Sequence, residues 1–299
     1  MIKILAFDLD GTLLTSEKKI DERTKAAIQK AMDQGIHVVL ASGRDRAGTR
    51  FVYEPLGLEN GENFLALING QIIYDFKKRE YDVEDVLGPA DGYAIQNICR
   101  QYGIEGIFMC GYDTYSYLSQ AGRVKKAARS LLTGEPKDYG LKEGKEERNY
   151  IELPFRPYEF TQDINKVCMV ETPKFFEKNL PKLRADLKHY DLLMVGPGWL
   201  EIMPKGVSKA SALKKIAEKV GVSLNEVMAF GDAENDIAMI EEAGIGVAMG
   251  NAMDTLKEKA DLVTATNNEN GIGQVIEALL AGHEEELRKG VLPAPEEAA

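Results

Sequence analysis

Short apolar runs alternate with amphipathic stretches over the first part of the chain. The runs Ile2 to Phe7 and Ile36 to Ala41 predict strands that are buried on both faces. An amphipathic helix is predicted between them, with Asp21 as its N-cap and Gly35 at its end. The apolar face of this helix consists of Ala27, Ile28, Ala31 and Met32. This rhythm is typical of βαβ units and therefore of a parallel sheet.

The pair Asn69-Gly70 interrupts the rhythm. It stands between the runs Leu65 to Ile68 and Gln71 to Tyr74. An Asn-Gly pair between two strand-like runs favours a tight turn, because both residues tolerate a positive φ angle. We therefore expect a hairpin at this point of the sheet.

The alternation returns from Ser208 onward, where an amphipathic helix is predicted. The segment in between is less regular, with helices near Pro89 to Tyr102 and Arg123 to Leu132. We infer an α/β protein in which both chain ends form one doubly wound, Rossmann-like parallel sheet, interrupted by an inserted α/β domain. The strands predicted in the returning part are Val227 to Phe230, Ile245 to Met249 and Leu262 to Thr264.

The domain boundaries follow from where the alternation stops and resumes. Residues 1–83 and 199–285 are expected to form the core domain, and residues 84–198 the inserted domain. Residues 286–299 are charged and rich in proline and alanine, so we expect a flexible tail. A chain of 299 residues is also too long for one ordinary hydrophobic core, which agrees with two modules.

The composition is that of an ordinary globular protein, with 44% hydrophobic and 28% charged residues. A net charge of -11 argues against nonspecific binding to nucleic acid or to an anionic membrane, since both need a basic surface. The three cysteines form no CxxC pair, so neither a disulfide framework nor a zinc site is indicated. No apolar run approaches the roughly 20 residues needed to cross a bilayer. We expect a soluble protein of the cytoplasm.

Polar residues follow the predicted buried strands. In open parallel sheets, reactive groups collect at the carboxyl ends of strands. Asp8 and Asp10 follow the first strand, and two carboxylates one residue apart can share a hard cation while one acts as nucleophile and the other as acid or base. Such acidic pairs are often only solvated turn residues. Here the buried strand directs them to the sheet edge, which favours the catalytic interpretation.

Three further features admit both a structural and a functional interpretation. Ser42-Gly43-Arg44 follows the second strand and fits either a phosphate cradle or a serine N-cap beside a solvated arginine. Gly231-Asp232 with Asn235-Asp236 fits either a set of oxygen ligands for Mg²⁺ or acids favoured in the first turn of a helix. Lys209 on its own is typical of a surface lysine on a helix.

Together these segments resemble the haloacid dehalogenase superfamily of phosphotransferases, and within it the Cof-type, sugar-phosphatase-like branch. The order, the spacing and the strand context all agree, and only the last dozen or so residues lie outside the resemblance. Ser42 stands where threonine is commoner, which keeps the hydroxyl group. The four matching segments are Asp8 to Leu13, Ser42 to Arg44, Lys205 to Lys209 and Gly231 to Asp236, and Leu67 to Gly70 is also similar to a family feature.

The resemblance implies a role for each of these residues. Asp8 would attack phosphorus, and Asp10 would protonate the leaving oxygen and then activate water. Mg²⁺ would be held by Asp8, the Asp10 backbone carbonyl and Asp232, with Asp236 close by. Residues expected to hold the phosphoryl oxygens are Ser42, Gly43, Lys209 and Asn235, and residues that could contact the rest of the substrate are Arg44, Asn69 and Gly70.

The implied protein is a Mg²⁺-dependent phosphomonoesterase for a small phosphorylated metabolite, with a sugar phosphate favoured. The inserted domain would be a cap that determines substrate specificity. A phosphomutase of the same superfamily would share these motifs but would return the phosphoryl group to the substrate. A non-catalytic module that accepts phosphate on Asp8 is the remaining alternative, and it would need neither Asp10 nor an insertion of this size. The motifs leave the substrate and the oligomeric state open.

Overall fold

The computed structural model describes residues 1–111, 113–134, 149–196 and 198–293. The chain divides into two compact units, each with its own sheet. One unit combines the two chain ends, Met1–Glu84 with Ser208–Ala299, and the other is the intervening segment Asp85–Val207. We call them the core unit and the inserted unit. This division agrees with the two modules that the alternation of apolar runs predicts.

The core unit is built on an eight-stranded sheet within the described ranges, in the order β14-β13-β12-β1-β2-β3-β4-β5. The first six of these strands are parallel, and β4 and β5 are antiparallel additions at one edge. The predicted doubly wound parallel sheet and the hairpin at Asn69-Gly70 are therefore confirmed. The strands are β1 (Ile4–Phe7), β2 (His37–Ala41), β3 (Phe64–Leu67), β4 (Ile72–Asp75), β5 (Glu80–Val83), β12 (Val227–Gly231), β13 (Ile245–Ala248) and β14 (Leu262–Val263).

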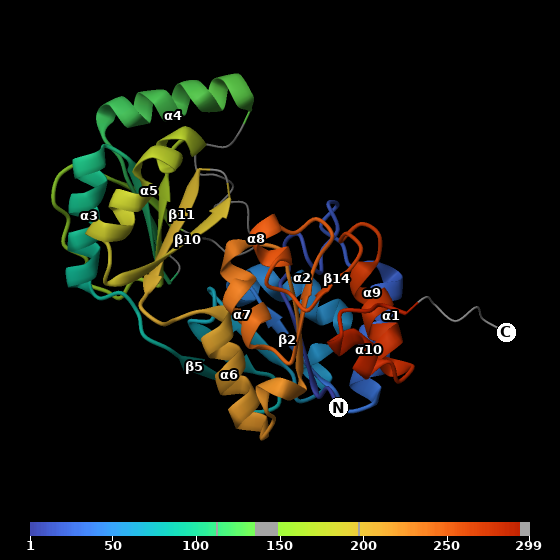
Figure 1. Ribbon diagram of the computed structural model, residues 1–299. Helices are drawn as coiled ribbons and strands as arrows, with labels where there is room; N and C mark the ends of the chain where they lie inside the picture. The colour runs from blue at the N-terminus through green and yellow to red at the C-terminus, as the bar shows by residue number, and fades with distance from the viewer. Residues whose placement is uncertain (112, 135–148, 197, 294–299) are drawn as a thin grey trace. The chain divides into compact units, whose positions relative to one another are not determined.

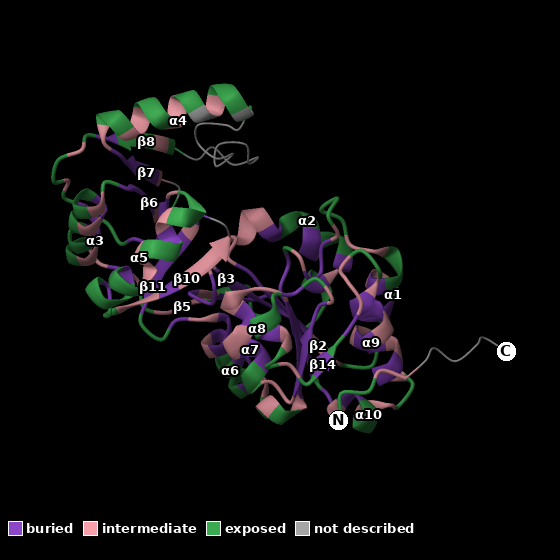
Figure 2. Cartoon of the chain, turned by 45° about the horizontal axis from the view of Figure 1, so that its top comes forward, coloured by how far each residue is buried: buried purple, intermediate pink, exposed green. Residues whose placement is uncertain are grey.

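Helices cover both faces of this sheet, with α1, α9 and α10 on one side and α6 and α7 on the other (Figure 1). Helix α1 begins as predicted, because the Asp21 side chain accepts hydrogen bonds from the backbone N–H groups of Arg23 and Thr24. The central strands are buried on both faces, as their uniform apolar sequence requires (Figure 2). The helices are α1 (Glu22–Asp33), α2 (Arg46–Leu56), α6 (Lys209–Val220), α7 (Ile237–Glu242), α8 (Asp254–Lys257), α9 (Gly271–Leu280) and α10 (Glu284–Arg288), with short 3₁₀ turns at Leu58–Asn60, Leu224–Glu226 and Glu234–Asp236.

The inserted unit has a six-stranded sheet over its described residues, in the order β10-β11-β9-β6-β7-β8. Phe108, Tyr117 and Phe176 are buried in its separate hydrophobic core. In the described ranges of the chain, no helix has both the length and the apolar character needed to cross a membrane. The elements of the inserted unit are α3 (Pro89–Tyr102), β6 (Glu105–Cys110), β7 (Asp113–Tyr117), α4 (Gln120–Thr133), β8 (Asn149–Leu153), β9 (Lys166–Val170), α5 (Pro173–Asp186), β10 (Tyr190–Gly196) and β11 (Trp199–Pro204).

Three predicted boundaries need correction. The inserted unit begins at Asp85 and not at residue 84. Residues 199–207 belong to the inserted unit and not to the core, because β11 forms hydrogen bonds with β9 and β10. The tail predicted at 286–299 begins later, since Leu287 is fully buried and the Arg288 guanidinium donates to the backbone carbonyls of Gly244 and Asn225. Leu292 also packs against the core. Residues 294–299 of the predicted tail lie outside the described residues.

Candidate active site

The predicted site residues lie where neighbouring parallel strands end. Strands β12, β1, β2 and β3 are adjacent in the sheet and run in the same direction. Asp232 follows β12, Asp8 follows β1, Ser42 follows β2 and Asn69 lies just beyond β3. The carboxyl ends of four strands therefore bring residues from distant parts of the chain to one edge of the sheet.

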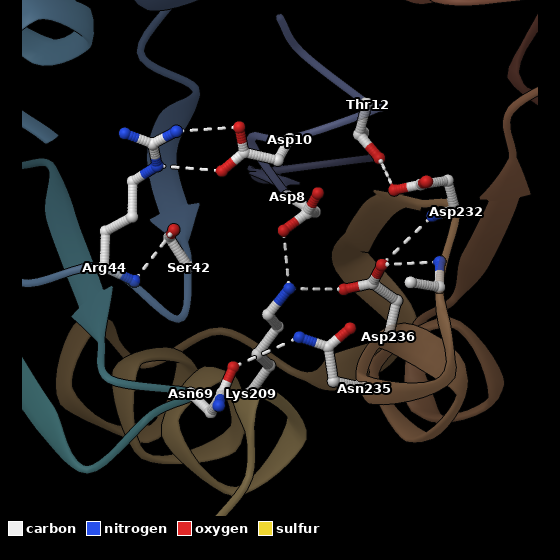
Figure 3. A network of polar contacts seen from close by, with 11 residues as sticks. Asp8, Asp10, Thr12, Ser42, Arg44, Asn69, Lys209, Asp232, Asn235 and Asp236 are labelled. Atoms are coloured by element: carbon white, nitrogen blue, oxygen red, sulfur yellow. Dashed lines mark hydrogen bonds and ion pairs between the residues drawn. The ribbon is translucent and has the colours of Figure 1, made fainter. Parts of the chain in front are cut away.

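Lys209 links the carboxylates of Asp8 and Asp236. Its Nζ atom lies 2.6 Å from Oδ1 of Asp8 and 2.6 Å from Oδ1 of Asp236 (Figure 3). The lysine is the first residue of α6, and its side chain is completely buried. Because a buried ammonium group is costly unless it is paired, the two carboxylates account for its position. The interpretation of Lys209 as a surface residue is therefore wrong.

Asp8, Asp232 and Asp236 form an acidic cluster around Lys209. Carboxylate oxygens of Asp236 and Asp232 also accept hydrogen bonds from neighbouring groups. Oδ2 of Asp236 accepts hydrogen bonds from the backbone N–H groups of Asp232 and Ala233, at 3.0 and 3.1 Å. Thr12 donates its hydroxyl to Oδ1 of Asp232 at 2.9 Å. Ligand atoms of Asp8, Asp232 and Asp236 all lie within 4.8 Å of one another. Three carboxylates at this separation, with oxygen atoms as donors, are suited to a hard divalent cation such as Mg²⁺.

The electrostatics of the cluster follow from burial and from an excess of negative charge. Burial raises the pKa of Asp8 to about 8, and the charges of Asp236 and Asp232 add to this effect while Lys209 opposes it. Burial and Asp236 raise the pKa of Asp232 to about 6. Burial alone would lower the pKa of Lys209, but Asp236 and Asp8 hold it above its usual range. The lysine therefore stays charged and leaves the carboxylates only partly neutralised.

Asp10 has a different set of partners. Its Oδ2 accepts a hydrogen bond from Nε of Arg44 at 2.8 Å, and its Oδ1 accepts from Nη2 of Arg44 and Nζ of Lys18, both at 2.7 Å. Figure 3 shows its carboxylate directed toward Arg44, whereas that of Asp8 is directed toward Lys209. Burial acts to raise the pKa of Asp10, but the two cations outweigh it and lower this pKa to about 2.

The predicted phosphate-binding segments are linked by asparagine side chains. Asn235 donates from Nδ2 to Oδ1 of Asn69 at 3.1 Å, and Asn69 is fully buried. The Asn69 backbone N–H donates to the carbonyl of Ser42 at 2.9 Å. A Cβ atom added to Gly43 would lie 3.2 Å from Oδ1 of Asn69, so this segment packs closely. These contacts hold the loops after β2, β3 and β12 together.

Gly70 has a structural role that the sequence prediction did not distinguish from substrate contact. Its φ angle is +94°, and an added Cβ atom would lie 2.1 Å from the carbonyl oxygen of Ser208, next to Lys209. We expect Gly70→Ala to destabilise the core unit by about 3 kcal/mol or more, because strain and a backbone clash add together.

Gly35→Ala is the matched control for this prediction. Gly35 also has a positive φ angle, +82°, but an added Cβ atom would have no neighbour within 4 Å. We expect it to cost only about 1 to 2 kcal/mol. The midpoints of urea unfolding, followed by circular dichroism, measure both losses, and equal shifts for the two variants would contradict the close-packing argument.

The structure thus brings the predicted residues into three connected groups. Asp8, Asp232 and Asp236 form the acidic cluster around Lys209. Asp10 and Arg44 pair with each other, and contact of Arg44 with the substrate stays a prediction. The loop group consists of Ser42, Gly43, Asn69, Gly70 and Asn235.

Sequence reasoning missed two residues that contact these groups and a third that contacts Gly11, the neighbour of Asp10. Thr12 lies inside the first motif, but its bond to Asp232 depends on a partner 220 positions away. Lys18 lies in a turn without any sequence signal for a role. Asn251 donates from Nδ2 to the carbonyl of Gly11 at 2.8 Å, and it also lacks such a signal.

Comparisons with known proteins agree with this geometry. Residues 5–276 match the family of haloacid dehalogenase-like hydrolases. The chain is 32% identical over 275 residues to 5-amino-6-(5-phospho-D-ribitylamino)uracil phosphatase YcsE of Bacillus subtilis, covering 92% of this chain and 94% of that protein. It is 30% identical over 298 residues to phosphatase YwpJ of the same organism, covering 93% and 100%. A crystal structure of a haloacid dehalogenase-like hydrolase from Bacteroides thetaiotaomicron is similar, with a TM-score of 0.72, 29% identity and coverage of 93% and 100%.

Proposed function

The chain belongs to the haloacid dehalogenase-like hydrolases and is related to phosphatases of that family, and on this premise we propose that it is a Mg²⁺-dependent phosphomonoesterase that works through an aspartyl phosphate at Asp8. One observation carries the proposal. The Asp8 carboxylate stands at the end of a buried strand with a buried ammonium group 2.6 Å from one oxygen. Such a nucleophile can receive a phosphoryl anion only where positive charge is already fixed in place.

In this mechanism Asp8 attacks the phosphorus atom of a phosphate monoester. The bond between phosphorus and the leaving oxygen breaks. Because Arg44 and Lys18 keep Asp10 ionised in the free protein, Asp10 takes up a proton with the substrate and donates it to that oxygen. Asp10 then takes a proton from a water molecule, whose oxygen attacks phosphorus and releases inorganic phosphate from Asp8. Asp10 thereby regains the proton that it gave to the leaving oxygen, so protons and charge balance over one cycle.

The carboxylates of Asp8, Asp232 and Asp236 fit Mg²⁺, because their ligand atoms lie within 4.8 Å of one another. The ammonium group of Lys209 pairs with two of them and leaves negative charge that a divalent cation would balance. Asp8, Asp232 and the backbone carbonyl of Asp10 would hold the ion, with Asp236 beside them. When bound, Mg²⁺ supplies positive charge that neutralises the phosphoryl oxygens. Asp236 also keeps Lys209 in place and accepts two backbone N–H groups, which supports a positioning role for it.

The phosphoryl oxygens would be held by the Ser42 hydroxyl, the Gly43 backbone N–H, Lys209 and Asn235. Positive charge and N–H or O–H donors come from the loop after β2, from α6 and from the turn after β12, and they suit a phosphate dianion at this edge of the sheet. The leaving group is proposed to be a sugar or polyol. The name of one relative specifies a phosphorylated ribityl chain, a primary phosphate ester of a polyol, as that enzyme's substrate.

Two further assignments belong to the same proposal. The inserted unit, with its own sheet and core, would be the cap that determines which leaving group is accepted. A location in the cytoplasm is supported by the three cysteines Cys99, Cys110 and Cys168, which are buried as free thiols.

The test is release of inorganic phosphate from a panel of phosphorylated sugars, polyols and small acids in the presence of Mg²⁺. We expect one phosphate for each alcohol formed. Removal of divalent ions with EDTA should lower the rate at least about 100-fold, and added Mg²⁺ should restore it.

Other outcomes separate the alternatives. An isomerised product without free phosphate would identify a phosphomutase, and stable phosphorylation of Asp8 without turnover would identify a phosphate-accepting module. Undiminished phosphate release in metal-free buffer would contradict the proposed mechanism.

A further inference from the structure

Both oxygens of the Asp10 carboxylate are held by cations. Arg44 donates to one oxygen from Nε and to the other from Nη2, at 2.8 and 2.7 Å, in the two-pronged geometry that a guanidinium group makes with a carboxylate. This arrangement fixes the plane of the carboxylate as well as its position. A lysine in place of Arg44 could not reproduce it, because an ammonium group is a point charge without a planar fork.

Arg44 is itself fixed from several directions. Its backbone N–H donates to Oγ of Ser42, and its backbone carbonyl accepts from the N–H of Ile68 at 3.0 Å. Its guanidinium group lies 5.5 Å from the ring centre of Phe51, and Nη1 points to the carbonyl of Gly48 at 3.4 Å. The loop after β2 therefore presents Arg44 to Asp10 as a rigid partner.

Lys18 is the weaker of the two cations. It makes a single contact of 2.7 Å with Oδ1 of Asp10, and its side chain is 58% exposed. It stands in a turn in which its N–H donates to the carbonyl of Thr15. An exposed lysine with one contact has more freedom and is more strongly screened by solvent than the Arg44 fork.

Resting on the proposed function, we propose that Arg44 is a positioning residue that holds the Asp10 carboxylate in the orientation from which it takes a proton from the hydrolytic water. The water oxygen bonds to phosphorus, the bond between phosphorus and Asp8 breaks, and the proton goes to Asp10. Arg44 acts through Asp10 and makes no bond to the reacting atoms. This proposal is an alternative to the prediction that Arg44 contacts the substrate, because Nε and Nη2 are both engaged with Asp10.

With p-nitrophenyl phosphate as substrate, the proposal can be tested separately on phosphorylation of Asp8 and on hydrolysis of the aspartyl phosphate. The leaving group of this substrate needs no proton, so phosphorylation of Asp8 does not depend on Asp10, whereas hydrolysis of the aspartyl phosphate does. For Arg44→Ala we expect kcat to fall about 10- to 100-fold while kcat/KM changes less than about 3-fold. We also expect a burst of p-nitrophenol approaching one equivalent per enzyme, with phosphorylated protein recovered after an acid quench.

Four controls make this result specific. Asp10→Ala should give the same burst, and Arg50→Ala, which removes an exposed arginine paired with Glu54, should behave as the unmodified protein does. Lys18→Ala should lower kcat only a few-fold. Methylguanidinium added to Arg44→Ala should restore part of kcat, as expected when a guanidinium group is the missing element. If Arg44→Ala does not fold by circular dichroism, Arg44→Lys carries the same kinetic test.

A parallel loss of kcat and kcat/KM without a burst would overturn the proposal, because it would make Arg44 a ligand of the phosphoryl group. Absence of any rescue by methylguanidinium together with a lost burst would also overturn it. Failure of the proposed function looks different. In that case Asp10→Ala would retain full activity or Asp8→Asn would still give phosphorylated protein, whatever Arg44 does.

Discussion

Asp8→Asn is expected to lower the rate of phosphate release by about 10⁴-fold or more. An amide of the same shape keeps the packing at the end of β1, but it cannot attack phosphorus to form the covalent intermediate. The Asn oxygen can still accept the hydrogen bond that Asp8 accepts from Lys209. The loss should therefore be one of chemistry and not of structure.

Phosphate release under saturating Mg²⁺ measures this effect, and Asp75→Asn is the matched control. Asp75 is also buried and accepts a hydrogen bond from the backbone N–H of Lys78, but it lies at the end of β4, outside the cluster. The control should retain activity within about 3-fold. If Asp8→Asn keeps more than a small fraction of the activity, the nucleophile is another group and the mechanism is wrong.

The same variant has an expected signature in stability. The pKa of Asp8 is raised from 3.8 to about 8 in the folded protein, so the native state binds more protons than the unfolded state between these values. Stability of the metal-free protein should therefore fall as the pH rises from about 4 to 8. Asp8→Asn removes this group and should make the fall shallower, as thermal unfolding in EDTA at several pH values can determine.

The core of the fold was predictable because its strands are buried on both faces. Uniform apolar runs such as Ile4–Phe7 and Val227–Gly231 stand out from amphipathic neighbours without knowledge of their partners. Strand β11 is also buried, but the predicted boundary at residue 199 assigned it to the wrong unit. It carries the buried Glu201, whose partner Lys166 is on β9, and it directly precedes the Lys205-Gly206 segment that resembles a core motif. Only its hydrogen bonds to β9 and β10 determine where it belongs.

The site was predictable where chemistry follows a strand end, and unpredictable where it depends on long-range pairing. Asp8 and Asp232 directly follow buried strands, so their convergence could be inferred from the sheet alone. Lys209 on its own resembles any helical lysine, because its partner Asp8 is 201 residues away, and only the family resemblance of Lys205 to Lys209 indicated a role for it. The pairing of Asp10 with Arg44 and Lys18 joins three segments, and no local pattern indicates it.

Lys209→Met should have the second large effect, on both activity and stability. The ammonium group is the shared partner of the Asp8 and Asp236 carboxylates, and its removal leaves buried negative charge without a counterion. Breaking a buried pair in this way costs about 3 to 5 kcal/mol. In EDTA we expect the thermal midpoint of the core unit to fall by at least about 6 °C. With Mg²⁺ present, kcat/KM should fall about 10³-fold, because a fixed positive charge no longer stabilises the phosphoryl group in the transition state.

Two comparisons link the stability loss to charge rather than to packing. Lys214→Met, at an exposed position of the same helix, should change the midpoint by no more than about 1 °C. The loss in Lys209→Met should be smaller at pH 5.5 than at pH 8, because protonation of the carboxylates removes the uncompensated charge, and saturating Mg²⁺ should reduce it for the same reason. A loss that is independent of both pH and Mg²⁺ would mean that Lys209 acts through its aliphatic chain, and the electrostatic account of this cluster would then be wrong.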